Sequence, residues 1–581
     1  MAINVLAIVV LVIFYAAILV VGLVAAWKVK VKGHAAGGLE ASLVAGRDLK
    51  GIIGIFTMIA TTVGGGYING TAESVARDGL VWTLAPVGIF IGLMMGGLVY
   101  AGKMREREYL TMLDPFQHHY GNLVTFLIYL ASLAGDLLWT ASILNALGTT
   151  LSVVADLQLS VAVLLSGSIT IIYTMAGSMI SVAYTDVVQL LFIFVGLTVS
   201  LPFVFTNSKV HDLRASQHTW LGQVSPQHWG IWLDLLIAMT LGTIPWQSYF
   251  QRVLSVRSVR DAQILSFVGA VGAFVMVIPS VLIGIAGASA DWNSTTYGTS
   301  PIGTQHSSLI LPLVINEFTT PVVSILGLGA ISAAVMSSMD SAVLGTSSMF
   351  THNIYCNMLR TRASSRELRV IQIVSILFFG SLSMAIALWS SVIYGVFILA
   401  ADIVFVIIFP QLTTILYLPK YCNPVGAICG FLVGLILRIG AGEDIIKMPV
   451  WIYFPFFNKQ QLFPFRTFAM LVSFVTVLAV TSVSRLQVMR FVCERFEYSA
   501  VHQDDGVSPA VQSGMSVDKA EARMVGDTDL LNTDRLKDNE ILQLDDAWQD
   551  IRRQDIRRQD CLEMDLMVIG KFRKLNAHGD M

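Results

Sequence analysis

The scarcity of charge in the first 493 residues is the feature that most limits how this chain can fold. Of the 76 charged residues in the sequence, 31 lie between Glu494 and Met581, which leaves 45, about 9%, in the preceding stretch. Soluble domains carry about 25% charged residues, so a stretch this poor in charge cannot cover a surface that faces water. The sequence therefore predicts an all-α protein that crosses a membrane many times, followed by a polar tail.

Apolar runs predict about thirteen transmembrane helices, because a helix needs about 20 apolar residues to cross the hydrocarbon core. The runs are 5–27, 49–73, 79–101, 122–155, 160–176, 179–205, 230–251, 262–289, 308–357, 368–389, 391–418, 423–440 and 466–490. Every second loop is basic, and one of these basic loops contains Arg252, Arg257 and Arg260. Since basic loops mark the cytoplasmic side, we expect an extracellular N-terminus and a cytoplasmic C-terminus.

Other sequence signals favour a transporter at the cell surface over an enzyme. Asn293-Ser294-Thr295 is a glycosylation sequon, and it lies in a loop that the alternation places outside. Neither a Walker A loop, nor a zinc-protease motif, nor a nucleophile elbow is convincing anywhere in the sequence. We therefore expect no catalytic residues, and transport driven by an ion gradient.

Two of the predicted spans contain residues that break helices. Gly64, Gly65 and Gly66 follow one another in one span, and Pro245 interrupts another, so neither helix is expected to be continuous. Unwound backbone inside a membrane lines cavities, and paired breaks indicate an inverted-repeat transporter. The alternative is that the glycines only permit close helix packing.

The two broken spans lie five helices apart, which predicts a core built from two repeats of five helices. The predicted organisation is an extra helix and first loop at 1–48, the transport core at 49–420, two further helices at 421–490 and a cytoplasmic, largely disordered tail at 491–581.

Two hydroxyls and a backbone carbonyl on one helix face suggest a cation site. Ala334, Ser337 and Ser338 have the spacing of a single face, and hard cations prefer oxygen ligands. The alternative is that the serines bond to their own helix or a neighbour. Ionisable side chains within spans suggest function by default. Of these, Asp186 and Asp340 are candidates for a second ion site or for coupling, whereas Asp234 and Asp402 lie near span ends and could equally be solvated.

Aromatic residues near the breaks are candidates for binding an organic cation. A quaternary ammonium cannot donate hydrogen bonds, and each aromatic face attracts it with about 0.5–2 kcal/mol. Trp246 directly follows Pro245 and is the best candidate. The other aromatic residues near the breaks are Tyr67, Trp82, Trp139 and Tyr249, and for Trp82 and Trp139 a packing or interfacial role is equally plausible.

Six segments together resemble the sodium/solute symporters, and within them the choline-transporter branch. They are 61–73 (TTVGGGYINGTAE), 111–117 (TMLDPFQ), 182–189 (VAYTDVVQ), 244–254 (IPWQSYFQRVL), 327–341 and 409–411 (FPQ). The resemblance implies a leucine-transporter-like fold and sodium-coupled uptake, with chloride dependence in choline transporters. It also implies sodium ligation by the carbonyls of Ala60, Val63 and Ala334 and the hydroxyls of Ser337 and Ser338, and a choline cage that includes Trp139 and Trp246.

Two positions depart from the choline-transporter pattern, which has tryptophan where this chain has Thr62 and tyrosine where it has Ile89. If both rings faced the cation, their loss would cost about 1–4 kcal/mol, or roughly five- to a thousandfold in affinity. The expected function is sodium-coupled choline import at the plasma membrane and in synaptic or endosomal vesicles. The alternatives are a symporter for another small amine or an organic acid, and a non-transporting sensor or channel with the same fold.

The tail after residue 490 is rich in charge and poor in aromatic residues, a composition typical of disorder. Asp527, Leu530 and Leu531 form an acidic dileucine pattern, which predicts binding of an endocytic adaptor. The alternative is a solvated tail that contains a short amphipathic helix.

Overall fold

The computed structural model describes residues 43–504, apart from 176–178, 305, 390, 391 and 459, together with scattered positions before residue 43. Within the described residues every regular element is a helix. The expected span at 5–27 therefore lies largely outside them, and the predicted sorting residues Asp527, Leu530 and Leu531 lie entirely outside. The chain divides into two units, residues 1–481 and 482–581. In the second unit the structure describes only the end of α20 (Phe465–Asp504).

Helices of the first unit follow one another in two sets of five spans. The first set is α3 (Gly51–Thr62) with α4 (Gly65–Arg77), α5 (Ala85–Met95) continued by η4 (Gly96–Ala101) and α6 (Gly102–Glu106), α8 (Asn122–Ala155), α9 (Leu159–Met175) and α10 (Met179–Thr206). The second set is α12 (Trp229–Leu241) with α13 (Gln247–Ser255), α14 (Val259–Ala288), α16 (Pro321–Met349) continued by η8 (Phe350–Leu359), α17 (Ser365–Trp389) and α18 (Ile393–Tyr417). Each set therefore begins with a broken helix.

Long apolar helices confirm a protein that crosses the membrane many times. Eight of the described helices are long and apolar enough to span a bilayer, and the bent pair α3 and α4 makes a ninth. After the two sets come α19 (Pro424–Gly440) and α20. The expected span at 308–357 is divided at residues 319–320 into α15 (Ile310–Phe318) and α16, because Pro321 begins the second helix at its first turn, where no amide donor is needed.

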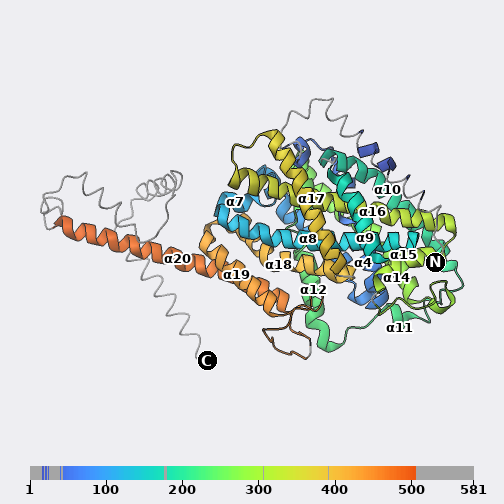
Figure 1. Ribbon diagram of the computed structural model, residues 1–581. Helices are drawn as coiled ribbons and strands as arrows, with labels where there is room; N and C mark the ends of the chain where they lie inside the picture. Colours follow the sequence, from blue (N-terminus) through green and yellow to red (C-terminus); the bar gives the residue numbers. More distant parts are fainter. Residues whose placement is uncertain are drawn as a thin grey trace. The chain divides into compact units, whose positions relative to one another are not determined.

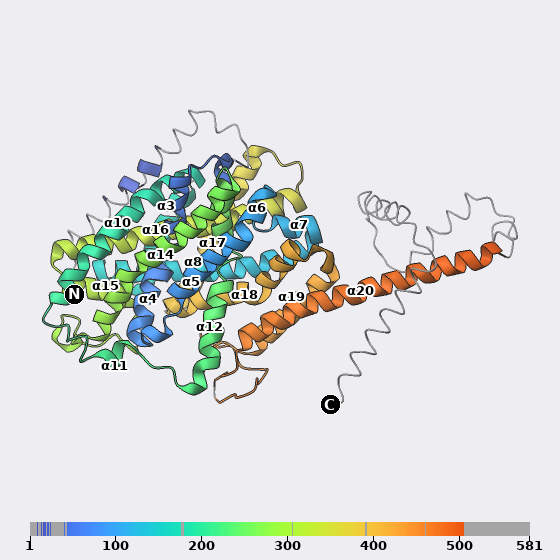
Figure 2. The same cartoon turned by 180° about the vertical axis from the view of Figure 1, so that it is seen from behind.

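The interior of the bundle is formed by helices that are distant in sequence. Helix α16 packs against both α8 and α10, and α18 runs beside α8 (Figures 1 and 2). Helix α3 packs against α10 and α14, whereas α4 lies against α14 and α18. This arrangement brings the first broken helix next to the serine-rich part of α16.

Loops that were expected on the same side of the membrane contact one another. The Arg105 side chain donates to the carbonyls of Val256 at 2.7 Å and Arg257 at 3.0 Å, and Arg257 pairs with Asp48 at 2.5 Å. At loops of the opposite group, the amide of Asp291 donates to the Lys209 carbonyl at 2.8 Å. The grouping of loops inferred from charge therefore agrees with the fold.

A buried ionic network holds α12, α18, α19 and the start of α20 together. Asp402 accepts from Arg438 and from Arg466, each at 2.8 Å. Asp234 accepts from the amides of Arg466 at 3.1 Å and Thr467 at 2.7 Å. Asp234 and Asp402 are buried, so the solvated alternative for these two carboxylates is wrong.

Candidate functional site

The break in the first helix leaves two backbone carbonyls without their helical donors. The axes of α3 and α4 meet at 46°, with Val63 and Gly64 in extended or irregular backbone between them. A continuous helix would direct the Gly64 amide to Ala60 and the Tyr67 amide to Val63. Instead these amides donate to the carbonyls of Thr62 at 2.9 Å and Gly64 at 3.0 Å. The carbonyls of Ala60 and Val63 therefore lose the partners that a helix would provide.

Helix α16 approaches this break closely through Ser338. The Ser338 hydroxyl donates to the Thr61 carbonyl at 3.3 Å. A Cβ atom placed on Gly64 would lie only 2.3 Å from the Ser338 Oγ, so a glycine is needed here for the two segments to meet. Ala334, one turn earlier on α16, is fully buried. The structure thus brings Ser338 to the break that also carries Ala60 and Val63.

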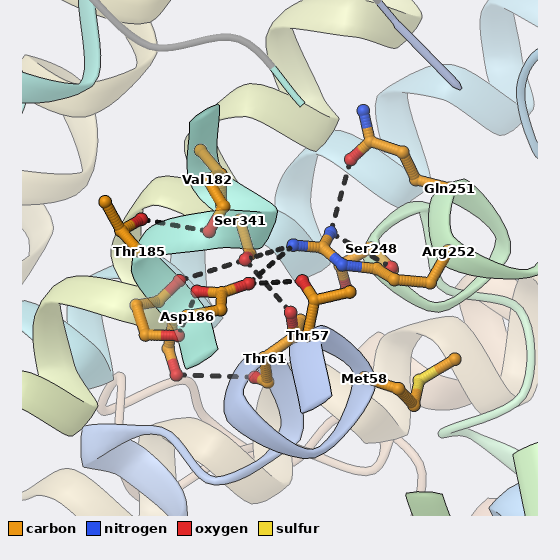
Figure 3. A network of polar contacts seen from close by, with 12 residues as sticks. Thr57, Met58, Thr61, Val182, Thr185, Asp186, Ser248, Gln251, Arg252 and Ser341 are labelled. Carbon is orange, nitrogen blue, oxygen red and sulfur yellow. Dashed lines mark hydrogen bonds and ion pairs between the residues drawn. The ribbon is translucent and has the colours of Figure 1, made fainter. Parts of the chain in front are cut away.

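Asp186 lies at the centre of a neighbouring polar network (Figure 3), and Ser337 contacts this network. The Ser337 hydroxyl donates to Asp186 Oδ1 at 2.5 Å, and Thr57 donates to Asp186 Oδ2. Ser341 lies within hydrogen-bond distance of Thr61, at 3.0 Å between the hydroxyl oxygens. Since a hydroxyl that donates still has lone pairs, these oxygens can also face a cation. The donor set, carbonyls, hydroxyls and one carboxylate, suits a hard cation such as sodium.

Arg252 is part of the same network, which corrects its assignment to a basic loop. It lies in α13, after the second break, and its side chain is fully buried. Its Nη2 donates to Ser341 Oγ at 2.5 Å and lies 3.7 Å from Asp186 Oδ2. The loop assignment failed because α13 continues through residue 255 instead of ending near Gln251.

A small cavity lies beside the two breaks, and four of the five predicted substrate residues line it. Its volume is about 50 Å³, well below the roughly 300–1,000 Å³ of typical small-molecule sites, so its walls must separate further to admit a substrate. The lining residues are Met58, Thr61, Thr62, Ile89, Leu93, Trp139, Thr243, Trp246, Ser248, Tyr249, Phe397 and Ala401. These described lining residues include no carboxylate, histidine, lysine or arginine, and their one titratable group is the Tyr249 phenol.

Trp139 and Trp246 form an aromatic corner in this cavity. Their ring centroids are 4.5 Å apart and their planes meet at 88°. Trp246 follows the second break in extended backbone, and its indole nitrogen donates to the Gly242 carbonyl at 2.6 Å. Since Pro245 has no amide hydrogen, the chain cannot continue α12 as a regular helix here. The break therefore both places and orients the indole ring.

Other predicted site residues lie elsewhere. Tyr67 is not part of the cavity lining, because its hydroxyl points to the Ala273 carbonyl on α14, at 3.4 Å. Asp340 accepts from Thr174 on α9 at 2.5 Å. Asn293, the predicted glycosylation site, is exposed.

Several residues at the site were not predicted from the sequence. Phe397 of α18 lines the cavity, but a phenylalanine in an apolar span carries no distinguishing signal. Thr57 and Ser341 contact the Asp186 network. A spacing signal exists for them, since Thr57 and Thr61 share one face of α3 and Ser337 and Ser341 share one face of α16.

The amino-acid sequence matches one family of known proteins over most of its length. A sequence model of the sodium:solute symporter family matches residues 43–434. High affinity choline transporter 1 of Homo sapiens is 44% identical over 84% of this chain and 86% of its own length. The high-affinity choline transporter 1 of Drosophila melanogaster is also 44% identical, over 82% of this chain and 78% of its own length.

The fold of this chain is similar to that of a solved structure. A Na⁺-coupled sialic acid symporter, in a substrate-bound outward-open state, aligns with a TM-score of 0.66 over 82% of this chain and 97% of its own. The two sequences are 17% identical, so the likeness concerns the fold alone. It confirms the predicted architecture of leucine-transporter-like type.

Proposed function

Because the chain belongs to the sodium:solute symporter family, we propose that it imports choline across the plasma membrane together with sodium ions. Relatives that are 43–44% identical carry the name of choline transporters. The observation that carries the substrate assignment is the pair of perpendicular indole rings, Trp139 and Trp246, in a cavity whose described lining has no carboxylate and no basic side chain. Aromatic faces bind a quaternary ammonium without needing a hydrogen bond from it.

Hydroxyl groups in the cavity suit the alcohol end of choline. Thr62 donates to the Met58 carbonyl at 2.9 Å and Thr243 to the Thr240 carbonyl at 3.0 Å. Both hydroxyl oxygens retain acceptor capacity, so either can receive the hydrogen of the choline hydroxyl. The cavity thus has an aromatic wall for the cationic end of the molecule and acceptors for its polar end.

The sodium ion is proposed to bind where the first break meets α16. Its ligands would be the carbonyls of Ala60, Val63 and Ala334 and the hydroxyls of Ser337 and Ser338. Support comes from the redirected amides of Gly64 and Tyr67 and from the approach of Ser338 to the break. A second ion, or the coupling of ion to substrate, would involve Asp186, with Asp340 on the next turn of α16.

The test is uptake of radiolabelled choline by cells that express the chain, in sodium and in lithium or N-methylglucamine media. Saturable uptake that requires sodium is expected, and Trp246→Ala should weaken the apparent affinity by about two- to thirtyfold because it removes one aromatic wall. A Tyr453→Ala variant, altered at an exposed loop residue, should match the parent. Absence of saturable choline uptake would overturn the substrate assignment.

A second candidate function is symport of another small amine, favoured by the positions of Thr62 and Ile89 in the cavity lining. Fewer aromatic faces reduce the advantage of a quaternary ammonium over a smaller amine that can donate to the hydroxyls. An organic acid is less compatible, because its carboxylate would be buried without a cationic partner among the described lining residues. Competition of choline uptake by a panel of amines and acids separates these substrates.

A third candidate is a sensor or channel on the same fold. It would give sodium currents without solute flux, which electrophysiology combined with tracer uptake can detect. The oxygen ligands at Ser337 and Ser338 favour a coupled transporter instead.

The same proposal includes chloride dependence, the orientation in the membrane and the role of the tail. Replacement of chloride by gluconate should reduce uptake.

We propose that residues 49–420 form the transport core, with 421–490 as two added helices and 491–581 as a cytoplasmic tail. The extracellular side would carry a glycan at Asn293, which glycosidase treatment of Asn293→Gln and parent protein can test. The Asp527, Leu530 and Leu531 pattern would direct adaptor-mediated endocytosis from the surface into synaptic or endosomal vesicles.

A further inference from the structure

Arg252 places a permanent positive charge beside Asp186 and Ser341 (Figure 3). Its side chain and that of Asp186 are both fully buried, with 0% of each exposed. The two arms of the guanidinium have different partners. Nη2 donates to Ser341 and faces Asp186, whereas Nη1 lies 3.3 Å from both the Ser248 carbonyl and Gln251 Oε1.

The ion pair between Arg252 and Asp186 is loose for two buried charges. Nη2 and Oδ2 are 3.7 Å apart, beyond hydrogen-bond distance. By contrast, Arg438 contacts Asp402 at 2.8 Å, as expected for a charge-assisted hydrogen bond. Asp186 instead accepts hydrogens from Thr57 and Ser337. Two hydroxyls thus orient this carboxylate, while the guanidinium neutralises it from a distance.

We propose that Arg252 is a tethered cation that competes with sodium for Asp186. This inference rests on the ion position beside Asp186 in the proposed function. Without sodium, the guanidinium balances the buried carboxylate. When sodium enters beside Asp186, two positive charges face one negative charge in a buried region, which is unfavourable. The guanidinium then moves toward Ser248 and Gln251, whose oxygens already hold its other arm.

The position of Arg252 connects the two halves of the fold. Asp186 lies on α10 and Thr57 on α3, both in the first set of helices, whereas Arg252 lies on α13, directly after the second break. Trp246, which lines the cavity, immediately precedes α13. Displacement of Arg252 by sodium would therefore act on the segment that carries an aromatic wall of the cavity. It would also limit sodium affinity and so assist release of the ion into the cytoplasm.

The decisive experiment measures equilibrium binding of radiolabelled sodium to the purified full-length protein in lipid nanodiscs, without organic substrate. Arg252→Gln removes the charge and retains hydrogen-bonding capacity, so its half-saturating sodium concentration should fall about tenfold or more, the size of effect that a charge at this distance commonly has. Arg252→Lys keeps a charge but lacks the two-armed fork, so it should give a smaller fall. The control is Arg257→Gln, which removes a charge 63% exposed on the adjoining loop and should leave binding unchanged.

Chemical rescue separates competition from a merely structural role. In Arg252→Ala, added guanidinium chloride at low millimolar concentration should raise the half-saturating sodium concentration, whereas potassium chloride at equal ionic strength should not. The parent protein should show no such response.

Three results would contradict the inference while leaving the proposed function intact. They are an unchanged or higher half-saturating sodium concentration in a monodisperse Arg252→Gln protein, identical values for the Gln and Lys variants, and no response of Arg252→Ala to guanidinium. If Arg252→Gln does not fold, a value for Arg252→Lys at or above that of the parent overturns the inference by itself. Failure of the parent protein to bind sodium would instead overturn the proposed sodium site, and the inference with it.

Discussion

Ser337 and Ser338 are neighbours in sequence, yet their hydroxyls have different partners. Ser338 donates to the Thr61 carbonyl at the first break, whereas Ser337 donates to Asp186. This divergence follows from the helix, because consecutive side chains on α16 point about 100° apart. The same pair of residues therefore connects α16 to two different elements, α3 and α10.

Replacement of Ser338 by alanine should weaken sodium binding. Loss of one oxygen ligand to a cation costs about 1–2 kcal/mol, so the half-saturating sodium concentration for uptake should rise roughly five- to thirtyfold. Ser332→Ala is the matched control, because Ser332 lies on the same helix but donates only to its own Leu328 carbonyl. Equal sodium dependence of the two variants would argue against Ser338 as a ligand.

Introduction of tryptophan at Thr62 should strengthen choline binding. Thr62 lines the cavity, and its hydroxyl donates to the Met58 carbonyl of its own helix. Little is lost by its removal, because the Thr243 hydroxyl remains as an acceptor for the alcohol end of choline. A further aromatic wall would contribute about 0.5–2 kcal/mol, or roughly two- to thirtyfold in the KM for choline. Thr62→Leu adds apolar volume without a π face and serves as the control. A gain of similar size in both variants would mean that packing, and not the cation–π interaction, is responsible.

At the residue scale, the sequence can indicate positions that depend on local chemistry, but it cannot indicate those that depend on tertiary contacts. Trp246 was selected because it follows Pro245, and the structure places it in the cavity. Ser338 was selected from helical spacing alone. Arg252 was wrongly assigned to a loop, because the sequence alone does not tell a buried arginine from one in a loop. Its contacts with Asp186 and Ser341 show that it is buried in the bundle.

At the scale of elements, the two breaks differ in their origin. Between α3 and α4 the glycines permit the chain to unwind where α16 approaches, whereas between α12 and α13 Pro245 prevents a regular helix. Both breaks could be predicted from the sequence because glycine and proline act on the local backbone. The way that α16 fits against the first break could not, since it depends on helices more than 200 residues apart.

A methyl group at Gly64 should disturb the junction between α3, α4 and α16. The backbone of Gly64 (φ −93°, ψ 174°) is accessible to alanine, but the added Cβ would lie 2.3 Å from Ser338 Oγ and 2.7 Å from its Cβ. Helix α16 must therefore move away from the break, and we expect sodium affinity to fall about tenfold or more, as for the loss of at least one ligand.

Gly51→Ala provides the comparison for this variant, because a Cβ at Gly51 meets no other atom within 4 Å. Sodium-dependent uptake and surface expression should be measured together. Normal sodium affinity in a well-expressed Gly64→Ala protein would contradict the proposed role of this junction.

At the scale of the whole first unit, buried charges join the helices that follow the two repeats to the core. Arg438 of α19 and Arg466 of α20 both contact Asp402 of α18, and Arg438 also contacts Glu443 at 2.6 Å. Composition predicted that this part of the chain lies in the membrane, but it could not predict which charges pair. Asp402 and Arg438 are 36 residues apart, and their pairing depends on how α18 and α19 pack.

Removal of Arg438 should destabilise the protein as a whole. Arg438→Gln leaves Asp402 and Glu443 with less compensation in a buried site, and the loss of one partner of a buried pair costs about 3–5 kcal/mol. We expect a lower midpoint of thermal unfolding in detergent, with partial recovery in the double variant Arg438→Gln with Asp402→Asn. Arg360→Gln is the control, because Arg360 is 64% exposed and surface pairs contribute at most about 1 kcal/mol. Equal midpoints for the two single variants would contradict a stabilising role for the network.

At the first break, residues proposed to bind sodium and residues that face the substrate cavity lie within four positions of one another. The proposed sodium ligands at Ala60 and Val63 are backbone carbonyls, whereas Thr61 and Thr62 present side chains to the cavity. A point mutation cannot delete a carbonyl, so amino-acid changes at these two cavity positions can alter substrate choice while the local ion ligands stay in place. Thr62→Trp is a change of this kind. Selectivity for the transported solute can therefore diverge along this helix without loss of the driving ion.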